Sequence, residues 1–342
     1  MALPPRIVIF GAGSVGGYIG GRLLAAGADL VMVGRPKLAE QLAEHPLKVS
    51  DLNGFATQVT VTPSQFVTHG AAALAAADLV LVAVKSAATR EVGATLAASI
   101  RPGVPVVSLQ NGVSNSQVLQ EQLPDNTALA GMVPFNILQK APGHFHQGTF
   151  GHLMASSHPL LIQLQPLFEK AGLALELRED MSNVLWSKLL LNLNNPINAL
   201  SGLPLKEELS QRPYRRCLAM AQRETLGLLK QAGIATIRLT PLPATWLPTL
   251  MSSPDFLFTR LAKNMLAMDP IARSSMWEDL QAGRRTEVDY INGEVVHLAQ
   301  DLGTTAPVNA ALVALIRQAE KNNPGEPWSG PALFAHLKAA RP

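Results

Sequence analysis

The chain begins with a glycine pattern whose residue types are suited to holding phosphate groups. Residues 7–10 are apolar, Gly11 follows them directly, and residues 18–26 are typical of a helix. In such a strand–turn–helix, Gly11 permits the tight turn, Gly13 lets the backbone approach a pyrophosphate, and Gly16 lets the helix pack on the strand. Free N–H groups at the helix N-terminus would bind the phosphates, whereas a purely structural glycine turn is the alternative. The residues that we expect to contact a dinucleotide are Gly11, Ala12, Gly13, Ser14, Val15 and Gly16.

The residue after the second predicted strand indicates which dinucleotide is bound. Sites for NAD usually place a carboxylate here, which holds the ribose 2′-hydroxyl. This chain has Arg35 instead, with no acid at the strand end, and Asp29 precedes the strand. Because a guanidinium can pair with a 2′-phosphate through two N–H groups, we expect NADP(H). The alternative is a solvated loop arginine.

A second group of polar residues lies on a leucine-rich helix predicted over residues 183–200. Lys188, Asn192 and Asn195 fall at positions i, i+4 and i+7, which share one helix face. Most such stripes are solvated. However, Asn is a poor helix former and Pro196 should distort the helix, which suggests that this segment serves something besides stability.

The elements that would position these groups alternate between strands and helices as far as residue 177. Residues 78–84 form a continuous apolar run, typical of a parallel strand buried on both faces, and residues 104–109 repeat it. Alternation of this kind predicts a parallel, right-handed sheet whose ligands bind beyond the carboxyl ends of the strands. Gly11, Arg35, Lys85 and Asn111 all follow such strand ends.

Residues 127–155 interrupt the alternation, and we expect antiparallel strands there that extend the sheet. His144, His146, His152 and His158 fall in or just after this stretch. A metal site is conceivable, but no carboxylate or cysteine accompanies the alternating pair His144 and His146. We therefore interpret these histidines as surface or edge residues and expect no metal.

Beyond residue 180 the pattern is almost entirely helical, with predicted helices over 183–200, 214–232, 255–267, 287–301 and 307–321. The predicted fold class is α/β: a Rossmann-type doubly wound sheet over residues 1–179, followed by an all-α domain over residues 180–342. The tail after residue 324 is loosely patterned and could pack as an extension.

Composition limits the remaining function classes. The 342 residues are 47% hydrophobic and 15% charged, with a net charge of +3 that is spread along the sequence. No basic block favours nucleic acid or an anionic membrane, and no apolar run is long enough to span one. Residues 7–10 are too short for a signal peptide, and one cysteine, Cys217, allows no internal disulfide. We expect a cytoplasmic protein with a small, anionic ligand; a homodimer is an option on which the sequence does not decide.

Taken together, these motifs resemble the ketopantoate reductase (2-dehydropantoate 2-reductase) family over nearly the full chain, to about residue 320. The resemblance rests on the glycine turn, Arg35, the strand ending in Lys85, the Gln-Asn-Gly at 110–112, the Trp-x-Lys-x-x-x-Asn at 186–192, the Ser-Met at 275–276 and the Thr-Glu-Val-Asp-Tyr-Ile-Asn-Gly at 286–293. It implies a dinucleotide-binding domain followed by a helical domain. The implied reaction is the NADPH-dependent reduction of 2-dehydropantoate to (R)-pantoate for pantothenate synthesis.

The resemblance also implies roles for individual residues. Lys188 would be the general acid and Glu287 its partner carboxylate, while Lys85 and Asn111 would act around the nicotinamide. The residues that it implies for substrate binding are Asn111, Asn192, Asn195 and Ser275. These types suit the chemistry, because hydride delivered to a ketone carbon leaves negative charge on oxygen that a lysine can stabilise and protonate.

Some positions depart from the family pattern. Asn195 follows Asn192 by three residues where four are usual, Ala272 replaces an asparagine, and Leu205 lies where a polar residue is expected. The residues implied in hydride transfer are intact, whereas those implied in gripping the substrate are altered. Two alternatives therefore accompany ketopantoate reduction: reduction of another 2-oxo acid, and a non-catalytic NADP(H)-binding sensor.

Overall fold

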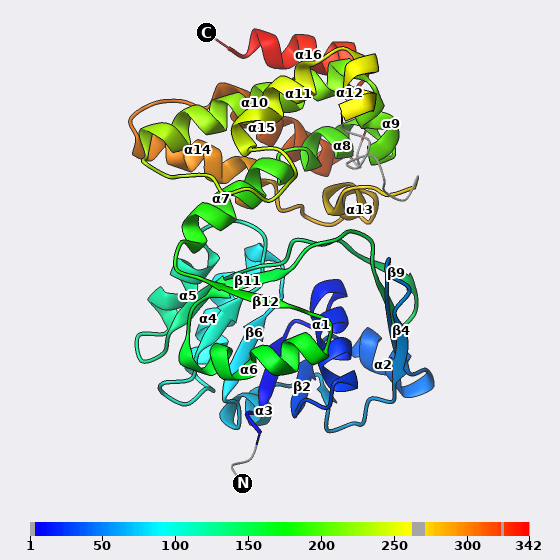
Figure 1. Cartoon of the computed structure of the whole chain (residues 1–342), viewed down its shortest axis with the longest axis vertical. Coiled ribbons are helices and arrows are strands. Elements are labelled where there is room, and N and C mark those ends of the chain that lie inside the picture. The colour runs from blue at the N-terminus through cyan, green and yellow to red at the C-terminus, as the bar shows by residue number, and fades with distance from the viewer. Residues whose placement is uncertain (1–3, 262–270, 323–324, 342) are drawn as a thin grey trace. The chain divides into compact units, whose positions relative to one another are not determined.

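A computed structural model describes residues 4–261, 271–322 and 325–341 (Figure 1). The chain folds into two compact units. The first comprises Met1–Gln110 and Ser114–Met181, and the second comprises Asn111–Val113 and Ser182–Pro342. The second unit thus includes a three-residue segment from far earlier in the chain.

The first unit is built on an eight-stranded sheet in the order β12-β11-β8-β7-β6-β1-β2-β5. Its strands are β1 (Ile7–Phe10), β2 (Leu30–Val33), β5 (Phe66–Val67), β6 (Leu79–Val82), β7 (Val106–Ser108), β8 (Ala128–Met132), β11 (Leu153–Ser156) and β12 (Leu175–Arg178). The strands from β5 to β8 pair in parallel, β11 runs antiparallel to β8, and β12 is parallel to β11. This is the predicted Rossmann-type arrangement.

Helices cover both faces of this sheet, as the apolar strands require. Ile7 and Ile9 pack with α1 and α6 on one face, whereas Val8 and Val80 pack with α4 and α5 on the other (Figure 1). Alternate residues of one strand are therefore buried on opposite sides. The helices of this unit are α1 (Ser14–Ala25), α2 (Pro36–Glu44), α3 (Ala71–Ala75), the 3₁₀ helix η1 (Ser86–Ala88), α4 (Thr89–Ala97), α5 (Asn115–Gln122) and α6 (Pro159–Lys170).

A second sheet in this unit corrects the prediction for residues 127–155. It has the order β4-β3-β10-β9, with β3 (Leu47–Asp51), β4 (Ala56–Val59), β9 (Ile137–Ala141) and β10 (His144–Gln147). Only β8 and β11 belong to the main sheet, whereas the β9–β10 hairpin joins the β3–β4 hairpin instead of extending it. Sequence alternation gives a strand's faces but not its partner, since pairing is decided by tertiary contacts.

The second unit is helical, as predicted. Its helices are α7 (Met181–Asn192), α8 (Asn195–Ser201), α9 (Leu205–Ser210), α10 (Arg212–Gln231), η2 (Ala244–Trp246), α11 (Leu247–Ser252), α12 (Asp255–Leu261), α13 (Ser275–Gln281), η3 (Val288–Tyr290), α14 (Asn292–Asp301), α15 (Pro307–Asn322) and α16 (Gly330–Ala339). One apolar core joins most of them. The predicted helix over 255–267 extends beyond the described residues after Leu261, and the loosely patterned tail contains α16, which packs on α10.

The single helix predicted over residues 183–200 is wrong, because it is two helices. α7 ends at Asn192 and α8 begins at Asn195, with Pro196 in the first turn of α8. Proline lacks the N–H that would continue the first helix and clashes with the carbonyl four residues earlier, but it is tolerated in a first turn. Asn195 therefore does not share a helix face with Lys188.

Across residues 4–261, 271–322 and 325–341, no helix combines the length and apolar character needed to cross a membrane.

Candidate active site

The glycine turn has the geometry that a dinucleotide requires. Gly11 adopts φ +107°, a conformation that side chains rarely tolerate, and a Cβ on Gly16 would collide with the carbonyl oxygen of Gly11. The space that a Cβ on Gly13 would occupy is open, because apart from the adjoining residues no atom of the described chain lies within 4 Å. Each glycine thus does what the sequence pattern predicts: tight turn, open approach and close helix packing.

The N-terminus of α1 faces this turn without a competing anion. Among the described residues, no side chain caps the helix at Gly13 and its first turn holds no acid. The partial positive charge of the helix end is therefore available to a phosphate. Backbone and helix end together fit the pyrophosphate of a dinucleotide.

Arg35 and Lys85 lie where the sequence predicts, just beyond the carboxyl ends of β2 and β6, the two strands that flank β1 in the sheet. Arg35 follows β2, precedes Pro36 at the start of α2 and is exposed. Its guanidinium forms no ion pair within the part of the chain that the structure describes. Lys85 follows β6, is exposed and precedes η1. Both are cations at the carboxyl edge of the parallel sheet, where phosphate and nicotinamide groups bind in such folds.

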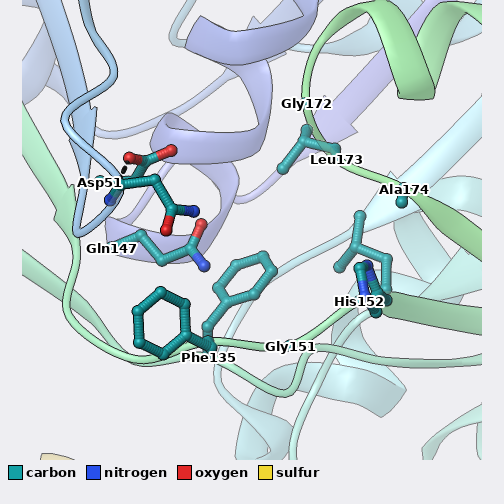
Figure 2. Close-up of a pocket in the computed structure, with 11 residues that line it drawn as sticks. Asp51, Phe135, Gln147, Gly151, His152, Gly172, Leu173 and Ala174 are labelled. Atoms are coloured by element: carbon teal, nitrogen blue, oxygen red, sulfur yellow. Dashed lines mark hydrogen bonds between the residues drawn. The ribbon is translucent and has the colours of Figure 1, made fainter.

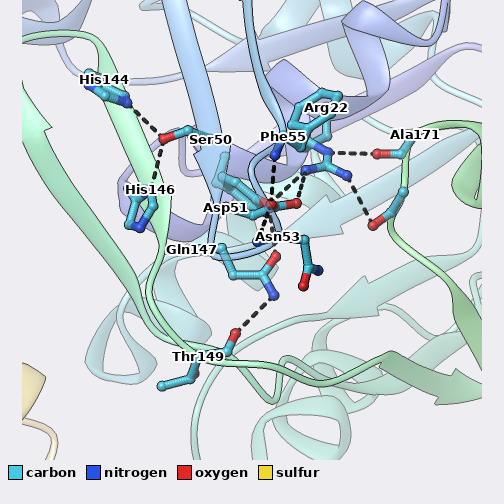
Figure 3. Close-up of polar contacts among 12 residues, drawn as sticks. Arg22, Ser50, Asp51, Asn53, Phe55, His144, His146, Gln147, Thr149 and Ala171 are labelled. Carbon is cyan, nitrogen blue, oxygen red and sulfur yellow. Dashed lines mark hydrogen bonds and ion pairs between the residues drawn. The ribbon is translucent and has the colours of Figure 1, made fainter. Parts of the chain in front are cut away.

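A buried ion pair holds the helix that carries the glycine turn. Arg22, on α1, is 4% exposed and donates to Asp51 of β3 over 2.9 Å (Figure 3). It also donates to the carbonyls of Ala171 and Gly172, over 2.6 and 3.2 Å. The guanidinium lies 3.8 Å from the ring centre of Phe55. These bonds fix α1 against the second sheet and the end of α6, so that Arg22 stabilises the helix that follows the glycine turn.

The histidine pair of the same sheet has a structural partner. Ser50 Oγ lies 2.9 Å from His144 Nε2 and 2.8 Å from His146 Nδ1 (Figure 3). Both histidines are partly exposed on β10, which lies between β3 and β9. Of the predicted surface or edge positions, the edge position is therefore wrong for this pair. Burial and the nearby Lys140 and Lys48 lower the pKa of His144.

The first unit also contains a cavity of about 260 Å³ (Figure 2). Its lining includes Asp51, Phe135, Gln147 and His152. Asp51 is engaged by Arg22, and Gln147 accepts from Tyr18 and donates to Thr149. The lining contains no residue that the sequence analysis assigned to a site.

Three predicted site residues are joined by hydrogen bonds in the second unit. Asn111 Nδ2 donates to Glu287 Oε2 over 3.1 Å, and Asn192 Nδ2 donates to Asn111 Oδ1 over 3.4 Å. Asn192 lies on α7 one turn after Lys188, so both point from the same face of that helix. The helix, the segment Asn111–Val113 and the loop before η3 thereby bring Lys188, two amides and a carboxylate into one region.

The loop that carries Glu287 is itself held from α15. Glu320 Oε1 accepts from the backbone N–H and from the hydroxyl of Thr286, each over 2.8 Å. Arg317 pairs with Glu320 and with Asp289. Glu287 is 6% exposed, so its carboxylate is fixed in a largely buried position. These partners were not identified from the sequence, because residues 317–320 carry no pattern of their own.

Lys188 has the electrostatics of an acid that can give up its proton near neutral pH. Burial of the ammonium, which disfavours its charge, lowers the pKa of Lys188 to about 8. A lysine in ordinary solvent would hold its proton more tightly. Such a shift brings a proton donor close to the pH at which a general acid works best.

Ser275 and Asn195 begin neighbouring helices. Ser275 is the first residue of α13 and Asn195 the first of α8, and these two helices pack together. Ser274 links them, because its Oγ donates to the Asn195 carbonyl over 3.2 Å and accepts from Trp277 N–H at the start of α13. The two altered positions also meet: Leu205 N–H donates to the Ala272 carbonyl over 2.8 Å.

Comparison with known proteins agrees with this geometry. The family description "Ketopantoate reductase PanE/ApbA" matches residues 7–159, and "Ketopantoate reductase PanE/ApbA C terminal" matches residues 180–320. The chain belongs to the ketopantoate reductase family. It is 28% identical over 324 residues to a 2-dehydropantoate 2-reductase of Halobacterium salinarum, covering 93% of this chain and 99% of that protein.

Solved structures of this family share its fold. The crystal structure of a PanE/ApbA family ketopantoate reductase from Ralstonia eutropha matches with a TM-score of 0.79 and 27% identity, over 93% of this chain and 99% of that one. D-mandelate dehydrogenase in a ternary structure with NADH and anilino(oxo)acetate matches with a TM-score of 0.74 over 93% and 99% of the two chains, but at 17% identity it shows the fold alone. As a member of the ketopantoate reductase family, the chain is an oxidoreductase that takes a nicotinamide cofactor and a small-molecule substrate.

Proposed function

We propose that the chain reduces 2-dehydropantoate to (R)-pantoate with NADPH, as a step of pantothenate biosynthesis. The observation that carries this proposal is the joined set of Asn111, Asn192 and Glu287 beside Lys188 on α7. A carboxylate, two amides and a lysine with a lowered pKa are the groups that a ketone reduction uses to orient its substrate and protonate the product oxygen.

The proposed roles of the residues follow from the electron balance of the reaction. When bound, the nicotinamide would supply a hydride to the ketone carbon. The carbonyl π electrons then move to oxygen, and Lys188 gives that oxygen its proton and becomes a neutral amine. Glu287 orients Asn111, and Asn111 and Asn192 donate or accept hydrogen bonds at the substrate. Ser275 and Asn195, at two helix starts, are proposed to bind the substrate carboxylate and hydroxyl groups.

We propose NADPH rather than NADH because of Arg35. Its exposed guanidinium, without an ion pair in the described residues, lies beyond β2, where an adenosine ribose is bound in such folds. The glycine turn Gly11, Ala12, Gly13, Ser14, Val15 and Gly16 is proposed to hold the pyrophosphate. Lys85 is proposed to act at the nicotinamide end.

A second candidate is the reduction of another 2-oxo acid. The backbone hydrogen bond from the Leu205 N–H to the Ala272 carbonyl favours it, because it joins two positions that carry apolar side chains here and polar ones in the family pattern. Apolar side chains in place of polar ones would suit a more apolar substrate. A NADP(H) sensor without turnover is a third candidate, although a binder has no need of a lysine acid.

One assay separates the three candidates. NADPH oxidation is followed with 2-dehydropantoate and with a series of 2-oxo acids of increasing apolar side chain. Turnover with 2-dehydropantoate far above the others supports the leading proposal, and turnover with another acid supports the second. NADPH binding without turnover of any acid would leave only the sensor.

A homodimer is a further proposal. The exposed side chains Trp246, Phe256 and Leu261 of the second unit, at 64%, 77% and 60%, give apolar surface that a partner subunit could cover. Sedimentation velocity over a range of concentrations tests it, and a purely monomeric species throughout would contradict it.

A further inference from the structure

The second unit contains a carboxyl group that has no role in the proposed chemistry and no exposure to solvent. Glu208, on α9, is 0% exposed. Its Oε2 accepts from Asn194 Nδ2 over 2.9 Å and from Asn198 Nδ2 over 3.3 Å. No lysine or arginine pairs with it in the described part of the chain. An ionised carboxylate in such a place would be strongly disfavoured.

One oxygen of this carboxyl, Glu208 Oε1, and the nearby Asn194 Oδ1 lack hydrogen-bond partners among the described residues. They belong to the same pair of side chains, which already share the bond from Asn194 Nδ2 to Glu208 Oε2. Both atoms are acceptors when the carboxyl is ionised, so neither can satisfy the other. A single proton on Oε1 turns it into a donor and supplies what Asn194 Oδ1 lacks.

We propose that Glu208 is a positioning residue that stays protonated in the folded protein and, as a carboxylic acid, pairs with the Asn194 carboxamide to hold the residues around the candidate active site. Oε2 of the acid then accepts from Asn194 and Asn198, and the protonated Oε1 donates to Asn194 Oδ1. Burial raises the pKa of Glu208 to about 8, in agreement with this pairing. The part of the inference that concerns catalysis rests on the proposed function.

Hydrogen bonds through both asparagines connect Glu208 to the candidate active site. Asn194 lies between the end of α7 at Asn192 and the start of α8 at Asn195, so its amide fixes the break between the two helices. Asn198 is 0% exposed, and its Oδ1 accepts from Ser274 N–H over 2.9 Å.

Ser274 completes the path. Its Oγ donates to the Asn195 carbonyl, and its position caps the helix that begins at Ser275. A buried acid on α9 therefore orients two of the residues proposed to bind substrate without touching the substrate itself.

The groups that face Glu208 do not titrate in the same range. From α10, Tyr214 and Cys217 interact with it electrostatically. Burial raises the pKa of Tyr214 above its ordinary value and that of Cys217 to about 12. Glu207 and Arg216 act on these two neighbours rather than on the buried acid. Asn194, just before α8, and Asn198, within α8, do not ionise. A pH-dependent change between pH 5 and 8 that Glu208→Gln removes is therefore assigned to Glu208.

The test of protonation compares wild type with Glu208→Gln, whose amide mimics the neutral acid, and with Glu207→Gln as the matched control on an exposed neighbour. A carboxyl whose pKa rises on folding stabilises the folded state fully below its ordinary value of 4.5, and this contribution is lost as pH rises towards 8. The urea midpoints of wild type and of Glu207→Gln should therefore fall, relative to that of Glu208→Gln, as pH rises from about 5 to about 8. Parallel midpoints for all three proteins would overturn the proposal.

The test of positioning uses kinetics with the 2-oxo acid that the enzyme turns over. Glu208→Met, which fills the space without hydrogen bonding, should lower kcat/KM by about 10- to 100-fold, mainly through KM for the acid. The affinity for NADPH should not change, and Glu208→Gln should restore kcat/KM. Equal losses in Glu208→Gln and Glu208→Met would overturn the role of the acid–amide pair.

The two tests keep the failure of this inference distinct from failure of the proposed function. If no 2-oxo acid is turned over, the proposed function fails, while the pH dependence of unfolding still decides whether Glu208 is protonated. If Glu208→Met does not fold, the comparison of urea midpoints between Glu208→Gln and wild type at each pH still decides whether Glu208 is protonated in the folded protein.

Discussion

Asn111 Nδ2 donates a hydrogen bond to Glu287 Oε2 over 3.1 Å, although the two residues are 176 positions apart in the chain. Asn192 donates to the other end of the Asn111 amide. The orientation of Asn111 is thereby fixed from both sides, with its carbonyl towards α7 and its amino group towards Glu287. An amide that cannot turn presents a defined set of donors and acceptors to a ligand.

The first prediction concerns this bond. Glu287→Gln removes the charge that fixes Asn111, and we expect a loss of about 1.5–3 kcal/mol in transition-state stabilisation, the scale of a hydrogen bond to a charged group. Steady-state kcat/KM with 2-dehydropantoate measures it. Glu326→Gln, an exposed residue of the same unit, is the control. Unchanged kcat/KM in Glu287→Gln would exclude a role for this carboxylate.

The second prediction concerns cofactor choice. Arg35→Ala should cost about 1.5–3 kcal/mol in kcat/KM for NADPH, because it removes a charged hydrogen-bond donor to the 2′-phosphate. The same change should have little effect with NADH, which lacks that phosphate. Arg90→Ala, an exposed arginine on α4 that pairs with Glu121, controls for loss of surface charge. Equal losses for both cofactors would contradict the assignment.

The third prediction concerns pH. With a pKa of about 8, Lys188 carries its proton at lower pH and loses it as pH rises through that value. The rate of reduction should therefore fall above pH 8, since the neutral amine has no proton to give at the moment of hydride transfer. Lys188→Arg, whose guanidinium stays charged, should be slow but free of this fall. A wild-type profile that is flat through pH 9 would show that the acid is another group.

The fourth prediction concerns the substrate. Ala272→Asn restores a side-chain amide at a position whose backbone carbonyl accepts from the Leu205 N–H. We expect kcat/KM for 2-dehydropantoate to rise by a factor that corresponds to about 0.5–1.5 kcal/mol, the scale of one hydrogen bond. Ala282→Asn, an exposed alanine after α13, is the control. A fall for 2-dehydropantoate together with a fall for more apolar 2-oxo acids would show that this surface does not select the substrate.

The glycine turn is a feature that the sequence alone predicts correctly. Gly11, Gly13 and Gly16 have the spacing and the backbone conformations that the pattern requires, because the turn is local and few residues can form it. The hairpin around Asn53-Gly54, which pairs β3 with β4, is likewise a local feature. Such features are determined by neighbours in the chain.

Other features depended on partners far away in the sequence. The sequence pattern predicts one helix where the structure has α7 and α8, although Pro196 signals the break, because a helical pattern continues on both sides of it. The partner sheet of β9 and β10 and the bonds from Glu320 to Thr286 lie outside any local pattern. Glu208 was missed for the same reason: its burial becomes visible only when α8 and α9 are packed together.

The central claim is that the chain is a 2-oxo acid reductase in which Lys188 is the acid. The most direct measurement is kcat for NADPH oxidation with 2-dehydropantoate in wild type and in Lys188→Ala, together with the Kd of each for NADPH. We predict turnover by wild type and a kcat that is lower by about 10²–10⁴-fold in Lys188→Ala, with NADPH binding little changed. An unchanged kcat with a raised KM in the mutant would contradict the claim, because Lys188 would then only bind the substrate.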